Sequence, residues 1–178
     1  MTTAEIVIPD PSLVVLIGAA GSGKSTFAAR HFASSEILSS DRFRAMISGD
    51  EADQAATAPA FARLHGELVM RLTNDRMTVV DATNLEPWAR RALLVRAKTA
   101  GVSATAIVLD LPAETVLARN AARQSRVVDE AVVRSHLGRV RASLDGPAPA
   151  LSREGFAEVV VLRDPAEVDL VRIRRRPT

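Results

Sequence analysis

The chain has 178 residues, enough for one domain around a single buried core and too few for a second domain of ordinary size. Hydrophobic residues make up 47% and aromatic residues only 3%, so the core must be built from aliphatic side chains, as suits a parallel sheet covered by helices. There is no cysteine, which excludes disulfides, thiolate metal sites and cysteine nucleophiles, and a net charge of +2 does not by itself indicate a nucleic-acid-binding protein.

Residues 1–12 (MTTAEIVIPDPS) lack the basic start, apolar stretch and small-residue cleavage site of a signal peptide. No apolar run in the sequence reaches membrane-spanning length. We therefore expect a cytoplasmic protein with no membrane partner.

Short apolar runs alternate with helical segments along the chain. The predicted strands are residues 13–17, 36–39, 78–81, 104–109 and 157–162. The predicted helices are residues 24–33, 59–75, 87–100, 112–123, 129–144 and a short 165–171. This alternation predicts an α/β fold, a three-layer α/β/α sandwich with a five-stranded parallel sheet, whose ligands bind at the carboxyl ends of the strands.

We interpret residues 1–178 as one domain with a helical lid at about residues 112–135. Residues 145–152 (DGPAPALS) are expected to form a loop. The last residues, 172–178 (RIRRRPT), are expected to be a mobile basic tail, either a true terminus or the start of an inter-domain linker.

The clearest motif is GAAGSGKST at residues 18–26, which matches G-x-x-x-x-G-K-[ST] directly after a predicted strand and before a predicted helix. Its glycines let main-chain N–H groups turn toward a phosphate, and the helix N-terminus adds its positive dipole end. Lys24 is expected to reach the β- and γ-phosphates of ATP, and the Ser25 hydroxyl to bind Mg²⁺. The residues predicted to bind the nucleotide here are Gly18, Gly21, Ser22, Gly23, Lys24, Ser25 and Thr26.

A carboxylate and an arginine follow the second predicted strand, in SSDRFR at residues 39–44. We expect this strand to run beside the first one and to deliver Asp41 to the rim of the γ-phosphate site. There Asp41 would accept the proton of an attacking hydroxyl, while Arg44 anchors the acceptor or the carboxylate. The alternative is that Asp41 only caps the next short helix.

Asp81 ends the third predicted strand and begins DATN, residues 81–84. Many P-loop proteins keep a carboxylate for Mg²⁺ at this position, usually through water, and we predict that role for Asp81. The alternative is that Asp81 and Asn84 fix the loop by hydrogen bonds to the main chain, which is the role we favour for Asn84.

Arg119, Arg123 and Arg126 recur at spacings of four and three residues, so on a continuous helix they would share one face. Such a face attracts polyphosphate, and a lid of this kind neutralises charge on the transferred group. The alternative is a solvated basic helix, because this chain uses arginine widely. We interpret none of the three histidines as a metal ligand, and we expect Phe43 to pack against a helix rather than to stack on a base.

Taken together, these segments indicate a single P-loop kinase domain over residues 1–178, and they resemble the kinase module of bacterial polynucleotide kinase-phosphatase, an RNA-repair family. The resemblance covers essentially the whole chain, and it is carried by the phosphate loop, ILSSDRFR, the segment containing VVDATN, LPAETVLARNAARQSRVV and REGFAEVVVL. It implies that Lys24 and Ser25 hold phosphate and Mg²⁺ and that Asp41 is the general base. It further implies that Arg44 binds near the acceptor phosphate and that Arg119 and Arg126 contact the ATP phosphates.

The resemblance also implies a partner and an assembly. The substrate would be a 5′-OH end of RNA or DNA, the module can self-associate as a homodimer, and in the family it is fused to phosphatase and ligase modules. The expected cofactors are ATP and Mg²⁺, with Mn²⁺ as an alternative cation. Arg42, Arg44, Arg90 and Arg91 are candidates for a basic acceptor groove.

Two other functions remain open from the sequence. One is a kinase for a small metabolite or sugar nucleotide, which would need a closed pocket rather than a groove. The other is a non-catalytic, nucleotide-gated interaction module, which would bind ATP and tolerate loss of the Asp41 carboxylate.

Overall fold

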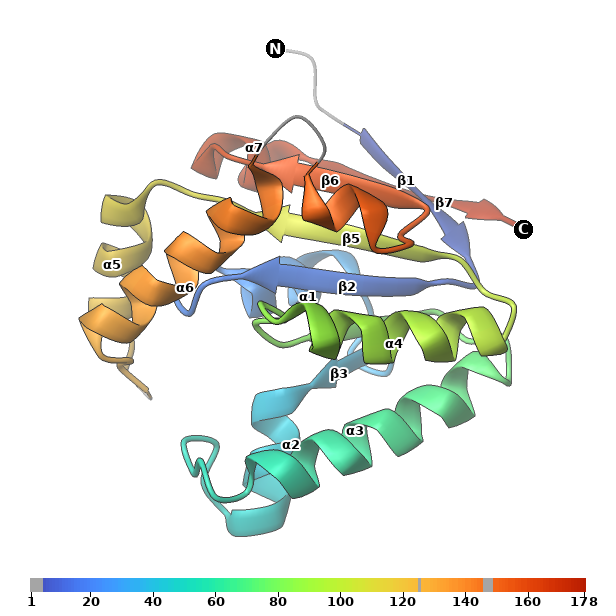
Figure 1. The fold of residues 1–178 in the computed structure, drawn as a ribbon, viewed down its shortest axis with the longest axis horizontal. Helices are drawn as coiled ribbons and strands as arrows, with labels where there is room; N and C mark the ends of the chain where they lie inside the picture. The colour runs from blue at the N-terminus through green and yellow to red at the C-terminus, as the bar shows by residue number, and fades with distance from the viewer. Residues whose placement is uncertain (1–4, 125, 146–148) are drawn as a thin grey trace.

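The computed structural model describes residues 5–124, 126–145 and 149–178 (Figure 1). The strands are β1 (Glu5–Asp10), β2 (Leu13–Gly18), β3 (Ile37–Ser39), β4 (Thr78–Asp81), β5 (Ala104–Leu109), β6 (Glu158–Leu162) and β7 (Arg172–Pro177). The helices are α1 (Lys24–His31), α2 (Ser40–Ser48), α3 (Thr57–Leu72), α4 (Pro87–Thr99), α5 (Ala113–Ala121), α6 (Glu130–Leu144), α7 (Pro165–Leu170) and the 3-10 helix η1 (Ala150–Arg153). Of the loop expected at 145–152, residues 146–148 lie outside the described part.

Five parallel strands form the central sheet in the order β3-β4-β2-β5-β6. This confirms the predicted α/β fold with a five-stranded parallel sheet. One detail of the prediction is wrong, because β3 does not run beside β2. The strand β4 lies between them, with Val14 paired to Val79 on one side and to Thr105 of β5 on the other.

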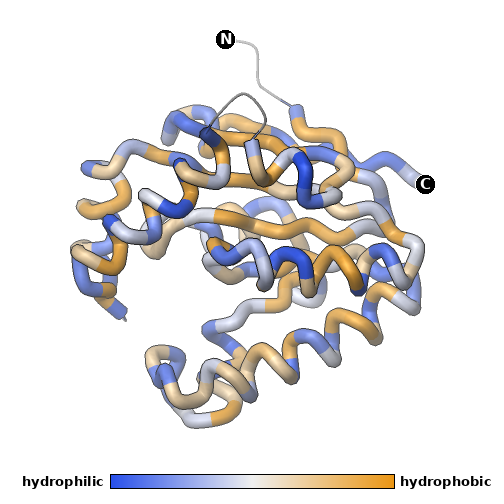
Figure 2. The backbone as a smooth tube through the Cα atoms, in the orientation of Figure 1, coloured by the Kyte–Doolittle hydropathy of each residue, from blue (hydrophilic) through white to orange (hydrophobic). Residues whose placement is uncertain are grey.

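The two faces of the sheet bury different helices, and the alternation within β2 shows why. Leu13, Val15 and Ile17 belong to one apolar cluster with residues of α3 and α4. Val14 and Leu16 point the other way, into a cluster with residues of α1 and α7. Figure 2 shows the result: the central strands are hydrophobic along their length, whereas the helices change from hydrophobic to hydrophilic along each turn.

A second, two-stranded sheet joins the two ends of the chain, because β1 pairs in parallel with β7 from Glu5↔Arg172 to Asp10↔Pro177. The prediction of a mobile tail at residues 172–178 is therefore wrong, because residues 172–177 form the strand β7. The pairing is anchored by Ile6 and Ile8, which are 4% and 0% exposed in the cluster under α1 and α7. Burying each of these side chains stabilises the pairing by roughly 1.5–3 kcal/mol.

Among the described residues, no helix combines the length and the apolar character that crossing a bilayer requires.

Candidate active site

The phosphate loop connects β2 to α1 at the carboxyl end of the central strand. Gly21 has a φ of +85°, which an L side chain rarely adopts. A Cβ on Gly21 would lie 2.7 Å from the carbonyl oxygen of Val116, and one on Gly18 would lie 2.7 Å from Oγ of Ser22. The loop is therefore packed against its own turn and against α5, and a larger residue at either position would force a neighbouring group to shift.

Lys24 is buried at the start of α1 and is folded back onto its own loop. Its Nζ donates to the carbonyl oxygens of Gly18 (2.9 Å) and Ala19 (2.7 Å), and to Oγ of Ser22 (3.4 Å). Burial lowers the pKa of Lys24 to about 8, against the opposing effect of the Asp81 carboxylate. The ammonium is thus held close to where a phosphate would bind, with main-chain oxygens as its present partners.

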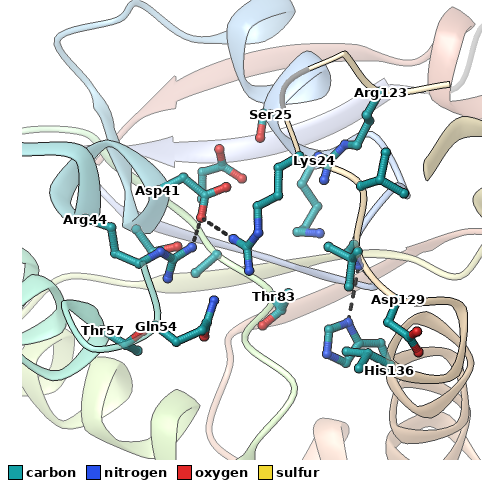
Figure 3. Close-up of a pocket in the computed structure, with 18 of the residues that line it drawn as sticks. Lys24, Ser25, Asp41, Arg44, Gln54, Thr57, Thr83, Arg123, Asp129 and His136 are labelled. Atoms are coloured by element: carbon teal, nitrogen blue, oxygen red, sulfur yellow. Dashed lines mark hydrogen bonds and ion pairs between the residues drawn. The ribbon is translucent and has the colours of Figure 1, made fainter. Parts of the chain in front are cut away.

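Asp41 lies in the first turn of α2, just after β3. The helix cap is Ser39, whose Oγ accepts a hydrogen bond from the N–H of Arg42 at 3.5 Å, so capping is not the role of Asp41. Its carboxylate instead forms an ion pair with Arg44 and lies 3.8 Å from Nη1 of Arg126 (Figure 3). Two guanidiniums therefore face one carboxylate, and 41% of the Asp41 side chain remains exposed to solvent.

Arg44 is itself buried, with 7% of its surface exposed. Its Nε donates to the carbonyl oxygen of Glu51 at 2.8 Å while Nη2 faces Asp41. Burial and the nearby charge of Arg126 lower the pKa of Arg44. With its donors divided between Glu51 and Asp41, Arg44 is placed to orient the carboxylate.

A cleft of about 620 Å³ joins these groups, and we call it the phosphate cleft. Its charged and hydroxyl-bearing walls include Lys24, Ser25, Asp41, Arg44 and Arg123 (Figure 3). Asp81 and Arg126 line it as well. Asp81 is 6% exposed at the end of β4 and is paired in register with Leu16 of the central strand. Ser25 and Asp81 therefore offer a hydroxyl and a carboxylate to the same space, which are oxygen donors that Mg²⁺ accepts.

No cluster of three or more His, Cys, Asp or Glu side chains suited to a metal ion occurs in the described part of the chain.

The three lid arginines do not share one helical face. The helix α5 ends at Ala121, so Arg123 and Arg126 lie in the segment that leads to α6. Both still line the phosphate cleft. Arg119 lies on α5, and its Nη1 would be 3.5 Å from a Cβ on Gly23, beside a smaller hollow that Thr26 also lines. The continuous basic face expected from the spacing is wrong because the helix ends two residues before Arg123.

Asn120 explains how the lid segment returns to the cleft without a helix. Its side chain is 4% exposed, its Nδ2 donates to the carbonyl oxygen of Val128 at 2.7 Å, and its Oδ1 accepts from the N–H of Val128 at 3.1 Å. This pair of hydrogen bonds ties α5 to the residues just before α6. Sequence reasoning missed Asn120, because its partner lies in a segment without regular structure.

His136 is a second residue that the sequence did not single out. Its Nδ1 accepts a hydrogen bond from the N–H of Ala20 in the phosphate loop, at 3.5 Å (Figure 3). Burial, reinforced by the positive charges of Lys24, Arg139 and Arg126, lowers the pKa of His136. The imidazole is consequently neutral at neutral pH and able to accept this bond.

Two residues near the cleft have structural roles. Asn84, at φ 48°, donates from Nδ2 to the carbonyl oxygens of Leu16 (2.7 Å) and Ala82 (3.3 Å), as expected for a loop-fixing residue. Arg90 is fully buried and pairs with Glu154 at 2.5 Å, so its expected place in an acceptor groove is wrong. Phe43 is partly buried against the core beside α3 and α4, which supports packing as its role.

Comparison with solved structures gives the fold. A chain of the Pnkp1/Rnl/Hen1 RNA repair complex superposes with a TM-score of 0.64 at 23% identity, over 75% of this chain and 45% of that one. A sugar kinase from Janibacter sp. HTCC2649 matches with a TM-score of 0.57 at 22% identity, over 89% and 90% of the two chains. A gluconokinase from Sinorhizobium meliloti 1021 matches with a TM-score of 0.54 at 19% identity, over 92% and 89%.

At these identities the likeness shows the fold alone, which is that of P-loop kinases. The chain spans less than half the length of the matched RNA-repair chain. A search of the curated proteins finds no significant match. A family profile described as "AAA domain", AAA_33, matches residues 13–147, well over half of the sequence. The phosphate loop, Asp41, Asp81 and the lid arginines all fall within that match, and the chain therefore belongs to the AAA_33 family of P-loop, kinase-like AAA domains.

Proposed function

We propose that this chain is an ATP-dependent polynucleotide 5′-hydroxyl kinase, which transfers the γ-phosphate of ATP to the 5′-OH end of RNA or DNA in nucleic-acid end healing. The observation that carries the proposal is the position of Asp41. Its carboxylate shares one cleft with Lys24 and Ser25 of the phosphate loop and is flanked by two guanidiniums. A nucleotide-binding module without catalysis would not require such a carboxylate.

In the proposed reaction the acceptor 5′-hydroxyl oxygen forms a bond to the γ-phosphorus and gives its proton to Asp41. The bond between the γ-phosphorus and the β–γ bridging oxygen breaks, and ADP leaves with that electron pair. Arg44 keeps the carboxylate oriented. Lys24, Arg123 and Arg126 supply positive charge where negative charge spreads over the transferred group.

Ser25 and Asp81 would hold Mg²⁺, or Mn²⁺ in its place, Asp81 directly or through water. The cation would neutralise the β- and γ-phosphate oxygens.

The choice of a polynucleotide acceptor is supported by the arginines of the phosphate cleft and by the motifs SSDRFR and VVDATN, which resemble those of the RNA-repair kinases. The planar guanidinium of arginine presents donors that match the oxygens of a phosphate. An acceptor strand carries such a phosphate one nucleotide from its 5′ end. A chain in an RNA repair complex is also among the structural neighbours.

A kinase of a small metabolite or sugar is the second candidate. It is favoured by the sugar kinase and the gluconokinase, which match over nearly their full lengths, whereas the RNA-repair chain is matched over 45%.

The two candidates are separated by one assay. The protein is incubated with γ-labelled ATP, Mg²⁺ and 5′-OH RNA or DNA oligonucleotides, in parallel with gluconate, uridine-diphosphate sugars and free nucleosides. Label on the oligonucleotide is the expected result. Label on a sugar alone would support the second candidate and contradict the first.

Two variants test the mechanism within the same assay. Asp41→Asn should abolish transfer and leave ATP affinity close to wild type, whereas Lys24→Ala should abolish transfer and also weaken ATP binding. Asp75→Asn is the matched control. Asp75 is exposed and precedes β4, at the end of the strand opposite to Asp81, and asparagine tolerates its positive φ of 50°. Normal transfer by Asp41→Asn would overturn the mechanism, and ATP binding without transfer to any acceptor would favour an interaction module.

A further inference from the structure

A second cavity, of about 630 Å³, lies beside the phosphate cleft, toward the first turn of α4. We call it the side groove, and its aromatic and aliphatic walls are Phe61, His65, Leu85, Trp88 and Leu93. The two cavities are adjacent, since they share five lining residues, Gln54, Thr57, Phe61, Thr83 and His136. An acceptor whose hydroxyl lies beside Asp41 can therefore extend into the side groove without leaving the protein surface.

Trp88 is unusual because it is a large aromatic residue whose side chain is not buried. The chain has six aromatic rings of Phe, Trp and Tyr, and the five phenylalanines are buried or packed against the core. Trp88 alone is mostly exposed, at 73%. An exposed indole on the wall of a groove offers a flat surface on which a second planar ring can stack.

Several polar groups of the side groove already have partners within the protein, although Oγ1 of Thr57, a buried atom, has none. Asn84 uses its Nδ2 on the carbonyl oxygens of Leu16 and Ala82, and Glu86 forms an ion pair with Arg139. A hydroxyl-rich sugar would depend on hydrogen bonds to the polar groups that remain, whereas Trp88 and the apolar walls offer a stacking surface. A heterocyclic base needs fewer hydrogen bonds, because stacking supplies much of its binding energy.

We propose that the side groove binds the nucleobase of the second nucleotide of a single-stranded acceptor, stacked on Trp88, while the terminal 5′-hydroxyl lies at Asp41. The inference rests on the proposed polynucleotide kinase activity and adds a substrate feature to it. The acceptor is recognised over at least two nucleotides, and recognition of the second is by stacking rather than by base sequence.

Fluorescence gives the most direct test, because Trp88 is the only tryptophan in the chain. Titration with a 5′-OH trinucleotide, without ATP, should quench the emission. A matched trinucleotide with an abasic second position should bind more weakly and leave the emission near its starting value. Equal quenching by both ligands, or quenching by neither at a concentration that saturates transfer, would overturn the proposal.

Kinetics give a second readout. For the wild type, kcat/KM should be about 10-fold higher for the intact trinucleotide than for the abasic one, in line with the measured range for one base stacked on an aromatic side chain. Trp88→Ala should remove this difference through KM, Trp88→Phe should retain most of it, and neither should change KM for ATP. Val95→Ala is the control, because Val95 is an exposed apolar residue of the same helix, 54% exposed, that does not line the side groove.

Two outcomes of these assays separate the role of the side groove from the proposed kinase activity. If the wild type phosphorylates trinucleotides and the abasic position makes no difference, only the role of the side groove is lost. If no oligonucleotide is phosphorylated while a sugar is, both are overturned.

Discussion

Arg126 of the lid segment and Asp41 of α2 meet across the phosphate cleft, with Nη1 of Arg126 3.8 Å from Oδ1 of Asp41. The same carboxylate oxygen pairs with Arg44. An incoming γ-phosphate would therefore attract Arg126 away from a carboxylate that still has a second guanidinium. We therefore expect Arg126 to exchange Asp41 for the γ-phosphate when the nucleotide binds, while Arg44 stays paired with the carboxylate.

Arg126→Ala should lower kcat for phosphate transfer about 10³-fold, because a guanidinium that neutralises the transferred group contributes most in the transition state. ATP affinity should change much less. Arg126→Lys should recover part of the rate, since it restores the charge but not the planar fork. Arg134→Ala is the control, as Arg134 is an exposed residue of α6 paired with Glu130. A rate within a few-fold of wild type for Arg126→Ala would contradict this role.

Nucleotide binding should take up a proton in mildly alkaline solution, because burial holds the pKa of Lys24 at about 8 in the free protein. A bound triphosphate favours the ammonium form and raises this pKa. Well below pH 8 the lysine is charged in both states, so there this group adds no pH dependence. Between pH 8 and the higher pKa of the complex, only the complex is protonated, and ATP affinity falls as the pH rises.

Calorimetry in buffers of different ionisation enthalpy measures this uptake, which should approach one proton at about pH 9 and be small near pH 7. Lys24→Met should abolish the uptake, and Lys98→Met, at an exposed position of α4, should retain it. Binding at about pH 9 without proton exchange in the wild type would show that Lys24 does not change its charge state on binding.

The parts of the fold and site that follow from the sequence are those with local signals. The run from Leu13 to Gly18 is buried on both faces, so its continuous apolar sequence predicts a central strand. Asp41 and Asp81 could be placed near the phosphate loop because each follows a parallel strand and such strands end at one edge of the sheet.

What the sequence did not predict depends on pairings between distant residues. The partner of β1 is β7, more than 160 residues away, and the run RIRRRP has only one apolar residue apart from its proline. His136 meets Ala20 across 116 residues, with no motif to indicate it. The helix α5 ends before Arg123, and Asn120 near its end is hydrogen-bonded to Val128, eight residues ahead. The spacing of the arginines alone therefore predicted the wrong geometry.

Gly21→Ala should weaken both the phosphate loop and its contact with α5. The substitution adds a Cβ at a φ of +85° and 2.7 Å from the carbonyl oxygen of Val116. Gly49→Ala separates the two effects, because Gly49 has a similar φ of +80° and nothing within 4 Å of an added Cβ.

The backbone effect alone should cost about 1–2 kcal/mol of unfolding free energy in Gly49→Ala, with normal ATP affinity. Gly21→Ala should cost more and should also reduce ATP affinity. Denaturant titration and calorimetry check the two quantities, and equal losses of stability in both variants would mean that the contact with Val116 relaxes without cost.

Arg90 should be required for stability rather than for acceptor binding. It is fully buried, its guanidinium pairs with Glu154 through Nε at 2.7 Å and Nη2 at 2.5 Å, and its Nη1 donates to the carbonyl oxygen of Asn84 at 2.9 Å. Arg90→Ala leaves the Glu154 carboxylate, 15% exposed, without its partner, and should lower the free energy of unfolding by about 3–5 kcal/mol.

The comparison variant is Arg91→Ala, at the adjacent exposed position of α4, which should change stability by no more than about 0.5 kcal/mol. Urea denaturation measures both variants. At a temperature where Arg90→Ala remains folded, its KM for a 5′-OH oligonucleotide should match that of the wild type, because the side chain is covered by Asn84 and Glu154 and cannot reach a strand. A variant with unchanged stability and a raised oligonucleotide KM would instead place Arg90 in the acceptor groove, and the side chain would have to leave its pair with Glu154 to act there.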